Sequence, residues 1–112
     1  MIEKETTKAK DALKVNVLFR FSKKTGKIDT TITGLGTGLM EMWCLRNTTK
    51  SKACLIIERD TGKVLFRAEG TSEGFPKAEH RRNKDLGVCT DYGIPLSMLQ
   101  AIKDERFDKE EA

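Results

Sequence analysis

Few side chains in this chain of 112 residues are arranged in a way that could do chemistry. The single histidine, His80, lies in a polar and basic stretch, and we expect it to be a solvated loop residue. A hydrolase that used His80 with Cys89 or Ser97 would need these groups at hydrogen-bonding distance, and their spacing gives no indication of that. We therefore predict no catalytic residue and a protein that is not an enzyme.

The potential ligands of a metal ion are no better placed. Three glutamates between residues 69 and 79 are separated by loop residues and accompanied by basic ones, which is not a calcium or magnesium pattern. The cysteines, Cys44, Cys54 and Cys89, are odd in number and have no Cys-x-x-Cys or Cys–His spacing, which argues against a zinc site and a disulfide framework. We predict buried, reduced thiols, no metal and no cofactor.

The glycine-rich stretch from Gly34 to Gly38 could in principle form a nest of amides for a phosphate. Its spacing fits neither the Walker A pattern nor the dinucleotide-binding fingerprint, so we predict a flexible turn. The following segment, Leu39 to Arg46, is compatible with a short helix or a strand. Its length of about eight residues favours the strand.

Positive charge is the clearest chemical feature of the sequence. The net charge is +4, but residues 1–12 sum to zero and residues 103–112 sum to −2, so residues 13–102 carry +6. A basic body of this kind attracts polyanions, and lysine and arginine bind phosphates with release of counterions. We predict a nucleic-acid partner, either single-stranded DNA or RNA.

The residues selected for this role are cations on the outer side of predicted strands, in turns, or in the loop from residue 71 to 85. Two aromatic residues are free to stack on bases, because the other aromatic residues are explained as core. The predicted nucleic-acid-binding residues are Lys14, Arg20, Arg59, Lys63, Arg67, Phe75, Lys77, Arg81, Arg82, Lys84 and Tyr92.

A protein-interaction module that binds no nucleic acid is the alternative. Edge strands could pair with another chain, and the methionines and tryptophan of the segment 39–45 could form a self-association patch. This alternative also predicts a homo-oligomer.

Alternation of apolar and polar residues indicates the elements that carry these side chains. Residues 13–21 alternate with the period of a strand, and residues 27–33 follow after a polar turn, which together form a first hairpin. The runs Cys54 to Ile57 and Val64 to Ala68 flank Asp60-Thr61-Gly62 and predict a second hairpin. The match between the two Thr-Gly-Lys turns is compatible with a repeated hairpin unit or with a common turn motif.

The last part of the chain contains a predicted short strand at Leu86 to Thr90 and a predicted helix. Ser97 with Gln100 has the spacing of a capping box, and an apolar side follows along the helix. We therefore predict an α+β fold: a single antiparallel sheet of five to six strands, built from hairpin repeats and packed on a C-terminal helix.

The run from Cys54 to Phe107 resembles the positive-cofactor-four and Whirly group of single-stranded-DNA-binding domains. The resemblance rests on the step Gly93-Ile94-Pro95-Leu96-Ser97 into the final helix, and on Arg59 and Lys63 around the hairpin turn. It implies a curved sheet that grips single-stranded DNA, helices behind it, and dimerisation or higher assembly. The basic and aromatic strand pattern and the lysine-glycine signature of Whirly proteins are not matched, and Pro95 replaces a strand-forming position.

The remaining expectations concern domain boundaries and location. We predict a flexible lead-in at residues 1–12, one domain at residues 13–108 and an acidic tail at residues 109–112. No apolar run approaches the roughly twenty residues of a membrane helix. The first residues lack the apolar segment of a secretory signal, so we expect a cytoplasmic protein.

Overall fold

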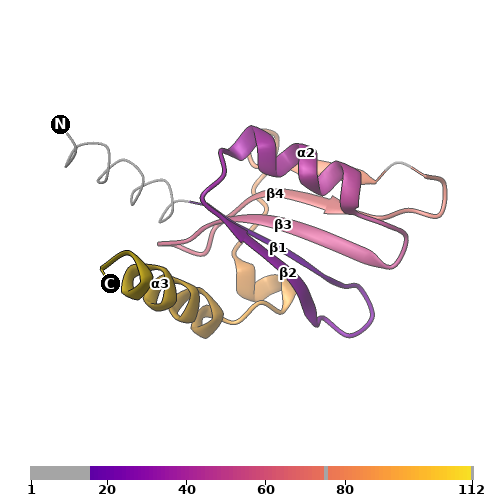
Figure 1. Cartoon of the computed structure of the whole chain (residues 1–112). Helices are drawn as coiled ribbons and strands as arrows, with labels where there is room; N and C mark the ends of the chain where they lie inside the picture. The colour runs from indigo at the N-terminus through magenta and orange to yellow at the C-terminus, as the bar shows by residue number, and fades with distance from the viewer. Residues whose placement is uncertain (1–15, 75, 112) are drawn as a thin grey trace.

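One open antiparallel sheet of five strands forms the centre of the molecule (Figure 1). The structure is a computed structural model that describes residues 16–74 and 76–111, with side chains as far as residue 104. The strands are β1 (Asn16–Ser22), β2 (Ile28–Thr33), β3 (Lys52–Glu58), β4 (Val64–Glu69) and β5 (Lys77–His80), in the order β2-β1-β3-β4-β5. The predicted α+β fold with one antiparallel sheet is confirmed.

The central strands β1 and β3 are apolar on both sides. In β1, Val17 and Phe19 are buried on one face of the sheet and Leu18 is buried on the other, as expected for a strand with a period of two. Leu55 and Ile56 of β3 divide between the faces in the same way. A sheet that is buried on both faces needs a cover on each.

Helix α2 (Thr37–Asn47) covers the first face, and here the predicted strand at residues 39–46 is wrong. Met40 and Cys44, four residues apart, lie on one side of the helix and pack against Leu18 and Ile56. The helix begins inside the glycine-rich stretch, which was predicted to be a turn. The predicted segment was too short because Gly38, a poor helix former, lies in the first turn of a helix that has 11 residues.

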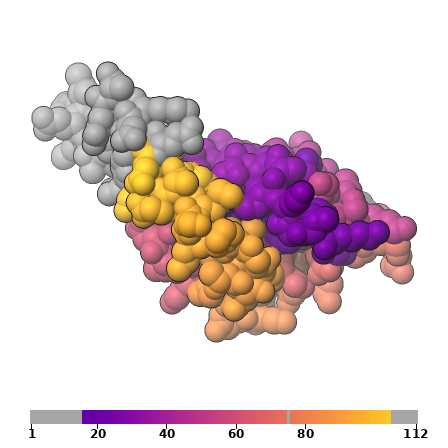
Figure 2. Space-filling model, turned by 90° about the horizontal axis from the view of Figure 1, so that it is seen from below, coloured from indigo at the N-terminus to yellow at the C-terminus, as the bar shows by residue number. Residues whose placement is uncertain are grey.

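The second face is covered by the 3-10 helix η1 (Cys89–Tyr92) and by helix α3 (Leu96–Glu111), seen from below in Figure 2. Met98, Leu99 and Ile102 of α3 pack with the core cluster on this face, which confirms the predicted C-terminal helix. The helix begins at Leu96, so Ser97 lies in its first turn and not at its cap. The prediction of one covering helix was incomplete, because helices lie on both faces.

Two local predictions between β4 and α3 are wrong. The predicted strand at Leu86 to Thr90 is a loop that enters η1, with a single bridge between Lys63 and Val88. Gly87 adopts φ of +79° there, a backbone conformation that breaks a regular strand. The predicted loop from 71 to 85 instead contains the edge strand β5, which pairs with β4.

Cys44 and Cys54 form a disulfide, so the prediction of three reduced thiols is wrong for this pair. The helix conformation of residues 37–47 brings the two sulfur atoms together, which a strand assignment could not anticipate. Cys89 is a free, buried thiol, and burial raises its pKa. Among the described residues, no helix is both long and apolar enough to cross a membrane.

We expect reduction of the Cys44–Cys54 bond to destabilise the fold. The disulfide ties α2 to β3 across ten residues of sequence, and such a link typically contributes about 2–3 kcal/mol. Dithiothreitol should then lower the Tm by roughly 10 °C or more. Thiol titration of the unreduced, denatured chain should count one thiol, that of Cys89; a count of three would show that the bond does not form in solution.

Candidate functional site

The predicted nucleic-acid-binding residues do not share one surface. Arg20 lies on the α2 face of the sheet and has a structural role there. Its Nε donates to Asp29 Oδ1 at 2.9 Å, its Nη1 donates to the Asn47 carbonyl at 3.2 Å, and its guanidinium carbon lies 5.4 Å from the centre of the Trp43 ring. These contacts join β1, β2 and α2.

Arg67 lies on the opposite face, on β4. Its Nη2 donates to Glu79 Oε1 at 2.7 Å and is 3.5 Å from Glu69 Oε2, and its guanidinium carbon is 6.0 Å from the centre of the Tyr92 ring. The Tyr92 hydroxyl donates to the Leu86 carbonyl at 2.8 Å. Arg67 and Tyr92 are thus the only predicted cation and aromatic residue that the described structure brings into contact.

Four predicted cations gather at the end of the sheet where β3 and β5 finish, and we call this group the arginine end. It consists of Lys63, Arg81, Arg82 and Lys84. Lys63 and Arg81 line an open hollow of about 410 Å³ with Asp85, Gly87 and Val88. Lys84 lies 3.2 Å from Glu79 Oε2, and this contact lowers the pKa of Glu79.

Three further predicted residues are Arg59, Lys14 and Phe75. Arg59, next to this end, is only 4% exposed. Lys14 and Phe75 lie outside the described residues, so their predicted roles are not examined by the structure.

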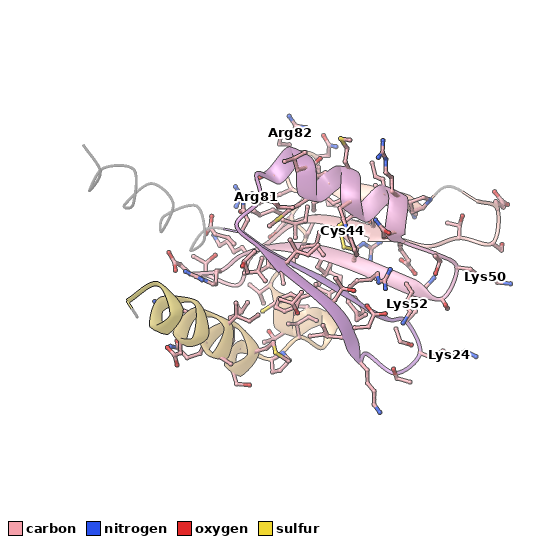
Figure 3. All side chains as sticks on the ribbon, in the orientation of Figure 1. Lys24, Cys44, Lys50, Lys52, Arg81 and Arg82 are labelled. Carbon is pink, nitrogen blue, oxygen red and sulfur yellow. A yellow bond between two sulfur atoms is a disulfide. The ribbon has the colours of Figure 1, made fainter. Side chains whose placement is uncertain are left out.

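Lys77 lies at the opposite end of the sheet, about 13 Å from Arg81 along the four residues of β5. It is joined there by lysines that the sequence analysis did not select, and we call the whole group the lysine end: Lys23, Lys24, Lys27, Lys50, Lys52 and Lys77. Figure 3 shows Lys24, Lys50 and Lys52 projecting from this end, and Arg81 and Arg82 lying at the other. A hollow of about 490 Å³ is lined by Lys23, Lys50, Lys77, Glu69, Gly70, Thr71 and Ser72.

Hydrogen bonds and close packing join the three connections that meet at the lysine end, which are residues 22–27, 48–51 and 70–76. The Lys23 amide donates to the Ser51 carbonyl at 2.9 Å, and the Gly70 amide donates to the Lys52 carbonyl at 3.2 Å. The Lys23 ammonium donates to the Gly70 carbonyl at 2.9 Å. Gly70 also passes so close to Thr49 that a Cβ atom at position 70 would overlap the Thr49 carbonyl.

The cations of the lysine end differ in how far they are neutralised. Lys23 lies 3.1 Å from Glu69 Oε1, and Lys52 lies 2.6 Å from Asp29 Oδ2. Hydrogen bonds from Arg20 and Lys52 hold the pKa of Asp29 well below its usual range. No described residue forms an ion pair with the remaining exposed lysines of this end, which are Lys24, Lys27, Lys50 and Lys77.

A sequence signal for the missed lysines existed. The turn Ser22-Lys23-Lys24 contains two lysines and the turn Thr49-Lys50-Ser51 contains one, and each adjoins a predicted strand. These lysines were not selected because the sequence prediction favoured the longest basic loop and the strand faces, and which turns lie next to one another depends on the strand order β2-β1-β3-β4-β5. The described residues contain no group of three or more His, Cys, Asp or Glu side chains that could hold a metal ion.

We expect Asp29→Asn to destabilise the fold by about 0.5–1 kcal/mol at pH 7, the upper range for partly exposed ion pairs. The folded-state pKa of Asp29 is lowered, so its contribution is present above pH ~4 and is lost as the pH falls further. Urea unfolding at neutral pH and at about pH 3 should show the difference between variant and wild type shrinking in acid. Glu73→Gln, an exposed loop change, is the control and should show no such trend.

Gly70→Ala should destabilise the protein by about 1–3 kcal/mol, because the added methyl group collides with the Thr49 backbone. Gly38→Ala is the matched control: position 38 is within α2, a Cβ there meets nothing within 4 Å, and alanine favours helix. Denaturant unfolding should therefore rank Gly38→Ala at or above wild type and Gly70→Ala below it. Equal stability of the two variants would contradict the close packing of the loops.

Comparisons with protein-family models, curated proteins and solved structures found no match to this chain. The resemblance to the positive-cofactor-four and Whirly group therefore remains a prediction. The lysine end is the surface on which three cations from separate parts of the chain, Lys23, Lys50 and Lys77, line one hollow.

Proposed function

We propose that this protein binds nucleic acid, single-stranded DNA or RNA, through the lysine end, and that it is not an enzyme. The observation that carries the proposal is the convergence of six lysines, four from two turns and two from the first residues of β3 and β5, with only three carboxylates of described residues, Asp29, Glu69 and Glu73, in the same region. Positive charge in excess at one exposed end attracts phosphates and releases counterions from them.

The arginine end supports the proposal less well. Its four cations lie among the acids Glu58, Asp60, Glu79, Asp85 and Asp91. With Arg59, which lies next to this end, five cations accompany five acids, so the region has no excess of positive charge, and Lys84 is already paired with Glu79. A polyanion gains less from approaching such a surface.

The shape of the lysine end favours a single strand over a duplex. It is built of turns and short loops, whereas α2 runs along one face of the sheet and α3 begins against the β3–β4 turn at the other end (Figure 1). Reading duplex DNA usually requires a helix or a strand pair that enters the major groove. Lysines beside the hydroxyl-bearing residues Thr71 and Ser72 suit the phosphates of a flexible chain instead.

A protein-interaction module is the second candidate, and the outer side of α2 favours it. Leu39, Met42 and Leu45 on this helix are 57%, 47% and 43% exposed. These residues recur at helical spacing, and an apolar stripe of this kind is a common feature of interfaces. Under this proposal the chain forms a homo-oligomer, and Leu39→Ser should leave a monomer in size-exclusion chromatography.

The cytoplasmic location also remains a proposal. The Cys44–Cys54 bond argues against it, since cytosolic disulfides are uncommon.

Paired charge reversals test the nucleic-acid proposal. Lys24→Glu with Lys50→Glu alters the lysine end, and Arg81→Glu with Arg82→Glu alters the arginine end by the same amount of charge. All four side chains belong to exposed residues, so both variants should fold. We expect the first variant to lose most of its affinity for a labelled oligothymidylate and the second to lose much less, measured by fluorescence anisotropy.

Salt dependence provides the second readout. Wild-type affinity should fall steeply between roughly 50 mM and 200 mM salt, and the first variant should show a shallower slope because it neutralises fewer phosphates. A larger loss of affinity in the arginine-end variant would instead place the binding site at the loop 71–85, as the sequence predicted. Weak binding that does not respond to salt, with a dimer on size exclusion, would favour the interaction module.

A further inference from the structure

A second, smaller hollow adjoins the lysine end on the α3 face of the sheet. It has a volume of about 190 Å³. Its lining residues are Phe21, Lys23, Ala53, Leu55, Arg67, Glu69 and Tyr92. Lys23 and Glu69 also line the larger hollow of the lysine end, so the two hollows are adjacent.

The chemistry of the smaller hollow differs from that of the lysine end. Buried side chains of Phe21, Ala53 and Leu55 form an apolar floor. The Tyr92 ring is held in position because its hydroxyl donates to the Leu86 carbonyl. A fixed aromatic ring beside an apolar floor is a surface on which another flat ring can stack.

Arg67 adds a polar group to this hollow. Its Nη2 is engaged by Glu79, but its Nε is buried and has no hydrogen-bond partner in the part of the chain that the structure describes. The guanidinium of Arg67 also lines the hollow, and a charged donor group of this kind favours a ligand part that can accept hydrogen bonds. The ligand part that suits the hollow is therefore flat, largely apolar on its faces and able to accept hydrogen bonds.

The volume limits the size of that part. Sites for drug-sized ligands usually span about 300–1,000 Å³, and this hollow is smaller, so it suits a single ring better than a two-ring system. A pyrimidine base has these properties. Its phosphates would then lie over the neighbouring lysines of the larger hollow.

We propose that one pyrimidine base of the bound strand inserts into the hollow beside Tyr92 while the adjacent phosphates contact Lys23, Lys50 and Lys77. This inference rests on the nucleic-acid proposal and deepens it. It gives Tyr92 and Arg67 a part in base binding, whereas the lysine end binds the backbone. The protein then has a preference for strands that carry bases over strands that carry phosphates alone.

The test compares a labelled oligothymidylate about 12 nucleotides long with an abasic oligomer of equal length and charge. Stacking of one base corresponds to about a 5- to 100-fold change in affinity, so the abasic strand should bind weaker by a factor in this range. An oligoadenylate should bind weaker than the oligothymidylate. Equal affinity of the thymidylate and abasic strands, with steep salt dependence, overturns the base pocket and leaves the lysine end intact; absence of binding to any strand overturns both.

Variants at Tyr92 and Ala53 test whether the preference for the thymidylate strand over the abasic strand arises in this hollow. Tyr92→Leu removes the ring and should bring the thymidylate and abasic affinities together, while Tyr92→Phe keeps the ring and should retain the difference. Ala53→Leu fills the floor and should act like Tyr92→Leu where circular dichroism shows a folded chain. Lys24→Glu with Lys50→Glu should weaken both strands by the same factor. A difference that survives in Tyr92→Leu would exclude this hollow as the base site.

Discussion

The pairing of β1 with β3 in the middle of the sheet is the constraint from which the other features follow. Seven residue pairs join these strands, from Asn16 with Glu58 to Ser22 with Lys52. Their side chains are buried on both faces, so each face has to be covered by another element. The chain between β2 and β3 supplies α2 for one face, and the chain after β5 supplies η1 and α3 for the other.

This arrangement also determines where charge accumulates. Residues buried on both sides of the central strands leave no room for cations there, except at the strand ends and edges. Arg20 is accommodated on β1 because its guanidinium forms an ion pair with Asp29 and packs over the Trp43 ring. The lysines are therefore concentrated in the connections, and antiparallel topology brings the connections 22–27, 48–51 and 70–76 to the same end of the sheet.

Local patterns in the sequence were sufficient to predict the two hairpins, the final helix and the fold class. In residues 16–22, Val17, Phe19 and Phe21 occupy every second position, which is the period of a strand and therefore a strong signal. The same reasoning failed for α2, since glycines at its start and exposed Leu39 and Met42 on its outer side masked the helical period. The disulfide partner of Cys44 was missed for the same reason. Most site residues were missed because the proximity of loops depends on topology, which single-sequence patterns do not encode.

The packing of Gly70 against Thr49 has a consequence for the energetics of recognition. Because Lys23, the segment 49–52 and Gly70 are joined by backbone contacts before any ligand arrives, association does not have to order these positions. The entropic penalty is then confined largely to the rotamers of the long lysine side chains, about 0.5–1.5 kcal/mol for each one immobilised. A surface whose backbone is already ordered and whose lysine side chains can change rotamer can contact successive phosphates of a flexible strand without a separate folding transition.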